Sequence, residues 1–87
     1  MDTMSENEFD VIDQLYFVTS FEDLLELTGL KESVLLDTLA DLISKSWVKC
    51  LVDPDNEISV TTEELKINYG KYQYLATKQG MLAHNKR

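Results

Sequence analysis

The sequence has few cysteine, proline and glycine residues, the types that are abundant in disulfide-bonded domains and in flexible chains. Its 87 residues include one cysteine, one proline and three glycines. A single Cys50 excludes an internal disulfide framework, which fits a reducing compartment. No apolar run approaches the roughly 20 residues that a membrane-spanning helix needs, and the first residues lack the basic and apolar regions of a signal peptide. We therefore expect a cytoplasmic protein without a membrane segment.

Positive charge is also scarce. The chain has 8 Lys and Arg against 16 Asp and Glu, a formal net charge of −8. Such an excess repels phosphate backbones at long range. The charge is unevenly placed, because residues 1–44 hold a single cation, Lys31, whereas residues 65–87 hold five cations and no acid. This asymmetry is typical of a nucleic-acid-facing end, of a self-complementary association surface, or of a solvated acidic face beside a basic terminus.

The side chains of catalysis and of cofactor binding are nearly missing. The one histidine, His84, is far along the chain from Cys50, whereas a nucleophilic pair needs contact and a third orienting group. The three glycines are isolated, so no phosphate-binding loop is present. The acids lack the spacing of a calcium loop. We expect a protein that is not an enzyme and has no cofactor, no metal and no small-molecule ligand.

What is present predicts one small domain over residues 1–87, with 1–7 a frayed terminus and 83–87 a polar tail. The spacing of Phe9, Ile12, Leu15 and Tyr16 predicts a helix over about 6–17. Ser20 is a good N-cap for a short second helix. Gly29 supplies the left-handed residue that ends it.

A longer helix is predicted from about Lys31 to Lys45. At 100° per residue one arc of this helix faces the core, and its members are Leu35, Leu36, Leu39, Leu42 and Ile43. The opposite arc holds Ser33, Val34, Asp37, Thr38, Asp41, Ser44 and Lys45. A short helix, a tight turn and a longer helix make a helix-turn-helix layout.

The second half of the chain predicts a small sheet. Residues 47–52 are typical of a strand, and 53–56 of a turn. Ile58 and Val60 suggest a second strand, 63–67 is ambiguous, and the strand pairing within 53–71 stays open. Residues 72–76 predict a last strand. Thr77 then caps a final helical turn, which Gly80 weakens.

These segments together resemble the winged helix-turn-helix family of bacterial transcriptional regulators. The resemblance is carried by the turn Thr28-Gly29-Leu30, the leucine-rich helix, the junction Lys45-Ser46-Trp47-Val48, and the closing run Tyr74–Gly80. It implies an α+β fold with a three-helix core and a small antiparallel sheet, the wing. Ser46 stands where the family usually has glycine. The family's DNA readers tend to show arginine and lysine on the face of the recognition helix that meets DNA, and between residues 33 and 41 this helix has neither.

Two functions follow from the resemblance and from the charge. The candidate recognition face is Ser33, Val34, Asp37, Thr38 and Asp41, and the candidate wing contacts are Lys66, Tyr69, Lys71, Tyr72 and Lys78. The first hypothesis is a non-catalytic, regulator-like binding module that works through a protein partner or as a homodimer, since tyrosine favours protein contacts. The alternative is a transcriptional regulator that binds duplex DNA through helix 31–45 and the basic wing.

Overall fold

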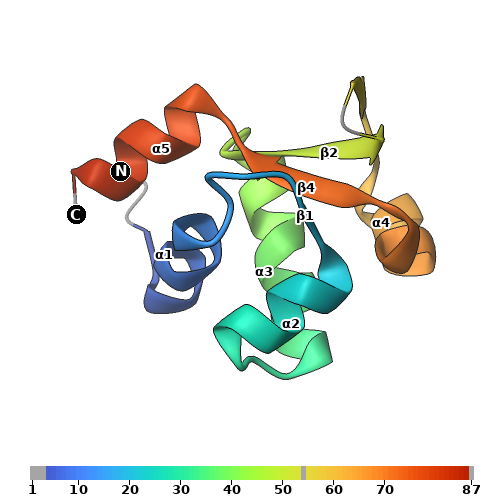
Figure 1. The fold of residues 1–87 in the computed structure, drawn as a ribbon, viewed down its shortest axis with the longest axis horizontal. Coiled ribbons are helices and arrows are strands. Elements are labelled where there is room, and N and C mark those ends of the chain that lie inside the picture. Colours follow the sequence, from blue (N-terminus) through green and yellow to red (C-terminus); the bar gives the residue numbers. More distant parts are fainter. Residues whose placement is uncertain (1–3, 54, 87) are drawn as a thin grey trace.

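The computed structural model describes residues 4–53 and 55–86, which form an α+β fold. Three helices lie below a small sheet, with a fourth helix at the right-hand end of the sheet and a fifth at its left (Figure 1). Among the described residues the elements are, in order, α1 Glu6–Asp13, β1 Thr19–Ser20, α2 Phe21–Thr28, α3 Glu32–Ser44, β2 Val48–Asp53, β3 Asn56–Ile58, α4 Thr62–Asn68, the 3₁₀ helix η1 Tyr69–Lys71, β4 Gln73–Ala76 and α5 Lys78–Asn85.

Helix α1 begins at Glu6, as the sequence predicts, but ends earlier than predicted. Ser5 caps it in a capping box with Glu8, so residues 5–7 belong to a capped helix and not to a frayed terminus; residues 1–3 lie outside the described residues. The helix stops at Asp13 and not near Phe17 because the chain leaves it to meet the sheet. The carbonyl oxygen of Leu15 accepts a hydrogen bond from the N–H of Ala76 at 2.9 Å.

Helices α2 and α3 follow one another as the sequence predicts, with a short helix, a turn at Gly29 and a longer helix. Ser20 accepts a hydrogen bond from the N–H of Asp23, and Gly29 has a φ of 70° at the end of α2. The Ser20 hydroxyl thus caps the first turn of α2. Gly29 ends the helix in the left-handed backbone conformation that suits glycine. On α3 the side chains of Leu35, Leu39 and Leu42 are fully buried as predicted, whereas Leu36 and Ile43 of the predicted core arc are half-buried.

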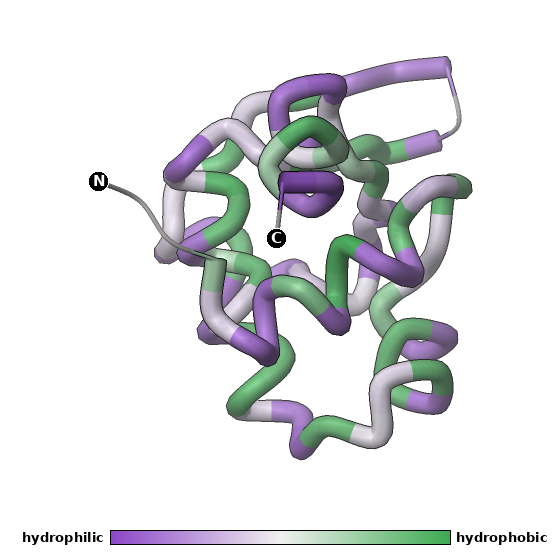
Figure 2. The backbone as a smooth tube through the Cα atoms, turned by 90° about the vertical axis from the view of Figure 1, so that its left-hand side faces the viewer, coloured by the Kyte–Doolittle hydropathy of each residue, from purple (hydrophilic) through white to green (hydrophobic). Residues whose placement is uncertain are grey.

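The sheet has the strand order β1-β4-β2-β3, and every neighbouring pair is antiparallel. Strand β4 lies in the middle of the sheet, where Tyr74 is opposite Cys50. The expected second strand is shorter than predicted, since β3 ends at Ile58 before Val60. The hairpin between β2 and β3 projects at the upper right of Figure 2, and its end is hydrophilic on both sides of residue 54. The predicted 53–56 turn lies partly outside the described residues, because Pro54 is not among them.

Helix α4 occupies the segment that the sequence left ambiguous. Thr61 accepts a hydrogen bond from the N–H of Glu64, and the Glu64 side chain accepts one from the N–H of Thr61. This reciprocal capping box fixes the start of the helix. Leu65 is its buried residue and anchors it to the core.

The ends of α3 and β4 are fastened together at Trp47. The Thr77 hydroxyl donates to the carbonyl oxygen of Ser46 at 2.7 Å, and the Thr77 N–H donates to that of Trp47 at 2.9 Å. A Cβ placed on Gly80 would lie 2.1 Å from the Trp47 carbonyl oxygen. Gly80 is therefore required by this close approach, whereas the sequence suggested only that it weakens the last helix.

Helix α5 extends the C-terminal end of the fold. Thr77 caps it as predicted, but it continues to Asn85, so residues 83–85 are helical and not part of a tail. It lies beside α1 (Figure 1), where the rings of Phe9 and His84 stack with centroids 4.1 Å apart. The two ends of the described chain are thus joined by side-chain packing.

Candidate binding surfaces

The outward side of α3 carries exposed polar and acidic side chains. Ser33, Asp37 and Asp41 are exposed and Val34 is half-buried. Thr38 was expected on the same face, but it is only 8% exposed and its hydroxyl donates to the Val34 carbonyl oxygen at 2.7 Å. Thr38 lies about 40° from Leu42 around the helix, at the edge of the apolar arc. Its hydrogen bond to the Val34 carbonyl oxygen gives the buried hydroxyl a partner.

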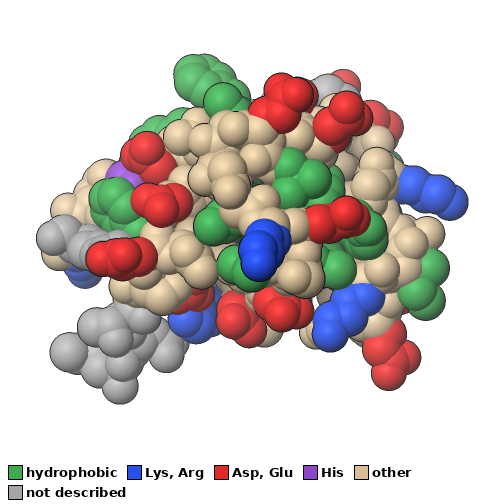
Figure 3. Space-filling view, turned by 90° about the horizontal axis from the view of Figure 1, so that it is seen from below, with side chains coloured by type: hydrophobic (Ala, Val, Ile, Leu, Met, Phe, Trp, Pro, Cys, Tyr) green, Lys and Arg blue, Asp and Glu red, His purple; other side chains and the backbone are tan. Residues whose placement is uncertain are grey.

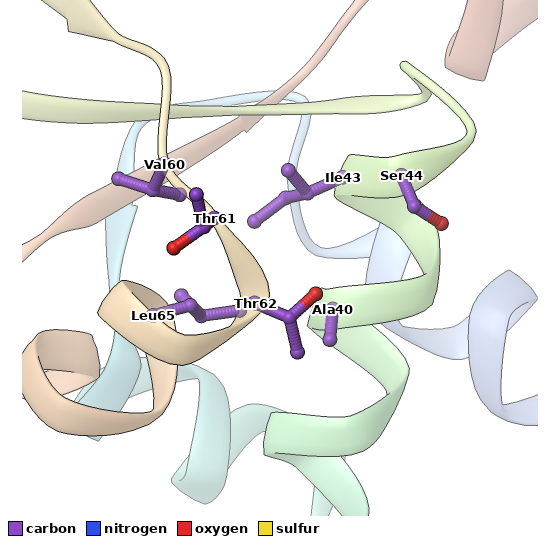
Figure 4. Close-up of a pocket in the computed structure, with 7 residues that line it drawn as sticks. All are labelled: Ala40, Ile43, Ser44, Val60, Thr61, Thr62 and Leu65. Carbon is purple, nitrogen blue, oxygen red and sulfur yellow. The ribbon is translucent and has the colours of Figure 1, made fainter.

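One flank of α3 is covered by α4. Between the two helices lies a hollow of about 210 Å³. Figure 4 shows Ala40 and Ile43 of α3 facing Leu65 of α4 across it. The Thr61 hydroxyl at its edge is already used to cap α4. Ser33, Asp37 and Asp41 do not line this hollow and are exposed on another side of α3.

The predicted wing lysines do not share one surface. Lys66 lies on α4 and Lys71 at the end of η1, whereas Lys78 is the first residue of α5, beyond the far end of β4. From residue 72 to residue 78 an extended chain covers about 20 Å. None of the three is on the β2–β3 hairpin. The structure thus brings Lys66 and Lys71 to one end of the sheet and places Lys78 at the other.

The predicted wing tyrosines are largely used in packing. The Tyr69 ring lies edge-on to Phe21, with centroids 4.5 Å apart, and its hydroxyl donates to the Glu32 carboxylate. That hydrogen bond raises the pKa of Tyr69. Tyr72 is half-buried against the core. The contact with Glu32 places η1, with Lys71 at its end, beside the first turn of α3.

Two surfaces carry exposed apolar side chains that the sequence analysis missed. The first, which we name the α4 patch, surrounds Ile67, whose side chain is 78% exposed; the exposed Lys66 and Lys71 flank it, and the exposed Glu63 and Glu64 lie one turn earlier on the same helix. The second, which we name the acidic groove, is a hollow of roughly 380 Å³ lined mainly by Phe17, Leu27, Asp23 and Glu26, together with Gln14, Val18 and Thr19.

The acidic groove lies where the α1–β1 connection passes α2. Phe17 is 81% exposed and Leu27 56% exposed, and Asp23 and Glu26 are exposed beside them. Figure 3 views the molecule from below and shows carboxylates spread over that face with apolar side chains between them. The sequence did hold a signal for this surface. Two further aromatic residues, Tyr16 and Phe17, follow Leu15, the last buried residue before β1, and both are exposed.

A partly buried ion pair between Lys45, the residue after α3, and Glu8 fastens the end of α3 to α1. The Glu8 carboxylate accepts from the Ser5 N–H at 2.9 Å and from Lys45 Nζ at 2.9 Å, each on a separate oxygen. Burial raises the pKa of Glu8, but the hydrogen bond from the Ser5 N–H and the interaction with Lys45 together outweigh it, so the pKa lies below its ordinary value. Lys45 Nζ also lies 4.9 Å from the centroid of the Trp47 ring.

The reactive side chains are placed for packing. Cys50 is buried in β2, and burial raises the pKa of its thiol to about 11, which keeps the thiol protonated at neutral pH. His84 lies on α5 between Phe9 and Tyr16, with Nε2 3.3 Å from an Asp13 carboxylate oxygen. Within residues 4–53 and 55–86, no three His, Cys, Asp or Glu side chains are grouped so that they could hold a metal ion.

Comparison of the chain with protein-family models, with curated proteins and with solved structures found no match in any of the three. Across the part of the chain that the structure describes, no helix has both the length and the apolar character needed to cross a bilayer.

Proposed function

We propose that this chain is a winged-helix domain. Three helices in the order α1, α2, α3 surround a leucine core, and a small antiparallel sheet follows. This arrangement, together with the tight turn at Gly29, supports the resemblance found in the sequence. Ser46, at the position where the family usually has glycine, has a φ of 63°, the left-handed conformation that glycine adopts without strain.

The domain acts as a non-catalytic binding module that works through protein contact and does not bind DNA strongly on its own. The observation that carries this proposal is the outward side of α3. Its exposed side chains include Asp37 and Asp41, and the helix contains no lysine or arginine. Neutralisation of phosphates by cations supplies most of the non-specific affinity for DNA, and carboxylates at that position oppose it.

Fluorescence anisotropy with labelled duplex DNA at two salt concentrations tests this proposal. We expect no binding tighter than about 10⁻⁶ M at low salt, because the charge that releases counterions is missing from α3. Tighter binding with a steep dependence on salt would refute it.

The second candidate is a regulator that reads duplex DNA through α3 and the neighbouring lysines. One observation favours it: the Tyr69 hydroxyl donates a hydrogen bond to Glu32, which joins η1, the element that ends at Lys71, to the first turn of α3, and the N-terminal end of a recognition helix is the end that contacts bases. If this function holds, Lys71→Glu weakens binding on every duplex, and Asp37→Ala changes the preferred sequence. The same titration measures both variants.

A further inference from the structure

The one histidine of the chain lies where α5 packs on α1. We infer that His84 is a proton-dependent latch: its protonated ring holds α5 on α1, and its neutral ring holds α5 less tightly. The ring stacks on Phe9 with centroids 4.1 Å apart, and its side chain is 11% exposed. The inference starts from what this stacked ring presents on each of its two nitrogens.

The first nitrogen, Nε2, is buried and faces a carboxylate. It lies 3.3 Å from Oδ1 of Asp13, which is close enough for an ion pair, yet among the described residues it has no partner in hydrogen-bond geometry. An ionised carboxylate only accepts hydrogen bonds, so Nε2 needs its own hydrogen to be satisfied there. A buried polar atom without a partner is costly. A positively charged ring gains most from alignment with the carboxylate, because charge-assisted hydrogen bonds are the stronger ones.

The second nitrogen, Nδ1, has two oxygens beside it. It lies 3.2 Å from the Tyr16 hydroxyl and 3.4 Å from Oδ1 of Asn85, and these two oxygens are 3.2 Å apart. The hydroxyl has one hydrogen to donate. A neutral ring with its hydrogen on Nε2 takes that hydrogen bond, and the Asn85 oxygen loses it. A protonated ring donates from Nδ1 as well, so the Tyr16 hydroxyl is free to donate to Asn85. Only the protonated ring serves all three neighbours at once.

The other charged groups near the ring agree with this assignment. On the same side of α1 as Phe9 and Asp13, Glu6 and Asp10 are exposed acids within one turn. On the α5 side the exposed Lys86 follows Asn85, and Arg87 is outside the described residues. Three carboxylates of α1 thus surround a ring that has one described cation near it, and this balance favours a positive charge on the ring.

The expected pH range follows from the composition of the chain. A histidine ring changes its charge between about pH 5 and pH 8, and the chain has one histidine. Carboxylates stay ionised across that range, and burial raises the pKa of the Cys50 thiol to about 11, so the thiol stays neutral. A contact that favours the protonated ring takes up a proton as it forms. It is therefore tightest at the acidic end of the range and weakens as the pH rises.

Amide hydrogen exchange of α5 in the full chain, measured at about pH 5.5 and about pH 8 and divided by the intrinsic exchange rates, tests the inference. We expect the α5 amides to be about two- to fivefold better protected at the lower pH, as suits a partly exposed ion pair. His84→Phe keeps a ring to stack on Phe9 and should remove the difference. The α-amino group titrates in the same range, and this variant retains it, so the comparison isolates the histidine.

A second pair of variants tests the carboxylate. Asp13→Asn should reduce the difference in protection between the two pH values, because the neutral amide attracts a positive ring less strongly. Asp37→Asn, an exposed acid on α3, is the matched control and should behave as the unmodified chain does. Circular dichroism verifies that each variant is folded.

Three outcomes overturn the inference. The first is equal protection of α5 in the unmodified chain at the two pH values, or better protection at the higher one. The second is a pH dependence that a folded His84→Phe variant retains, which would assign it to another group. The third is an undiminished difference in Asp13→Asn, which decides the matter even where His84→Phe does not fold. These results do not bear on the proposed function, which the DNA titration tests.

Discussion

The inward and outward sides of α3 differ in almost every respect. The inward side consists of Leu35, Leu39 and Leu42, which are fully buried. The outward side consists of exposed Ser33, Asp37 and Asp41. The inward leucines are part of the sequence resemblance to winged-helix regulators. The outward side has carboxylates where the DNA-binding members of that family tend to have lysine and arginine. The buried residues that hold the fold together and the exposed residues that are free to contact a partner are therefore distinct sets, even along one helix of thirteen residues.

Both ends of α3 are anchored by contacts with other elements. Its C-terminal end is fastened to α1 by the Glu8–Lys45 pair and to the Trp47 junction by Thr77 and Gly80. Its N-terminal end meets η1 through Tyr69 and Glu32. Like the buried leucines, these contacts hold the helix in place. None of them uses the exposed side chains of the outward side.

The largest expected effect is on the inward side. Leu39→Ala should lower the free energy of unfolding by roughly 2–5 kcal/mol, since it opens a cavity at a fully buried position. Chemical denaturation measures the change. Asp37→Ala on the outward side is the matched variant and should change stability by no more than about 0.5 kcal/mol. Similar losses of stability at the two positions would contradict the distinction between a buried inward side and an exposed outward side of α3.

The next effect is at the Trp47 junction. Gly80→Ala should destabilise by about 1–3 kcal/mol, because the new Cβ would lie 2.1 Å from the Trp47 carbonyl oxygen and the two backbones must separate. Gly70→Ala is the control, since a Cβ there meets nothing within 4 Å. Denaturant midpoints that shift equally for both variants would show that the junction is looser than described.

The Glu8–Lys45 pair predicts a dependence on pH. Glu8→Gln should lower the free energy of unfolding by about 1 kcal/mol at neutral pH, a value reduced for the partial exposure of Lys45. The pKa of Glu8 is lower in the folded chain than its ordinary value of 4.5. The stabilisation is therefore complete above about pH 4.5 and is lost as the pH falls through the lower, folded-state value.

Unfolding curves of the two proteins from pH 7 to pH 3 check this. The difference between them should shrink on acidification. Asp10→Asn, an exposed acid on the same helix, is the control and should show no comparable difference at neutral pH. A gap between Glu8→Gln and the unmodified chain that grows as the pH falls would contradict the assignment.

The smallest expected effect is a gain. Ser46 follows α3 with a φ of 63°, in a conformation that costs an ordinary residue about 1–2 kcal/mol. Ser46→Gly relieves that cost but adds freedom to the unfolded chain, so the net gain should be about 0.5–1 kcal/mol. Calorimetry should show a melting temperature a few degrees higher. A lower melting temperature would mean that the serine side chain has a stabilising role.

Much of the fold was predictable because its signals are local. The leucine spacing of α3, the glycine that ends α2 and the caps at Ser20 and Thr77 all depend on residues within one or two turns. The start of α4 was equally local, because the Thr61 and Glu64 spacing is that of a capping box. Its single buried residue, Leu65, gave too little periodicity for the helix to be recognised.

What could not be predicted depends on partners far along the chain. Helix α1 ends early because the Leu15 carbonyl oxygen accepts a hydrogen bond from the N–H of Ala76, and Tyr69 is held in place because its hydroxyl donates a hydrogen bond to Glu32. The exposure of Phe17 and Ile67 has the same origin. Both are apolar and both fit a core position locally, and only the packing of α2 and α4 leaves them at the surface. The candidate surfaces were therefore harder to predict than the helices that support them.

In the proposed function, the acidic outward side of α3 prevents strong binding of DNA. The low-salt affinity for one labelled duplex, measured for the unmodified chain and for the double variant Asp37→Lys/Asp41→Lys, tests this. A control, Asp10→Lys/Glu22→Lys, makes the same change in net charge away from α3. We predict weak binding by the unmodified chain and a gain of at least about tenfold in the α3 variant, larger than in the control. Binding by the unmodified chain tighter than about 10⁻⁶ M, weakened by the lysines on α3, would contradict the claim.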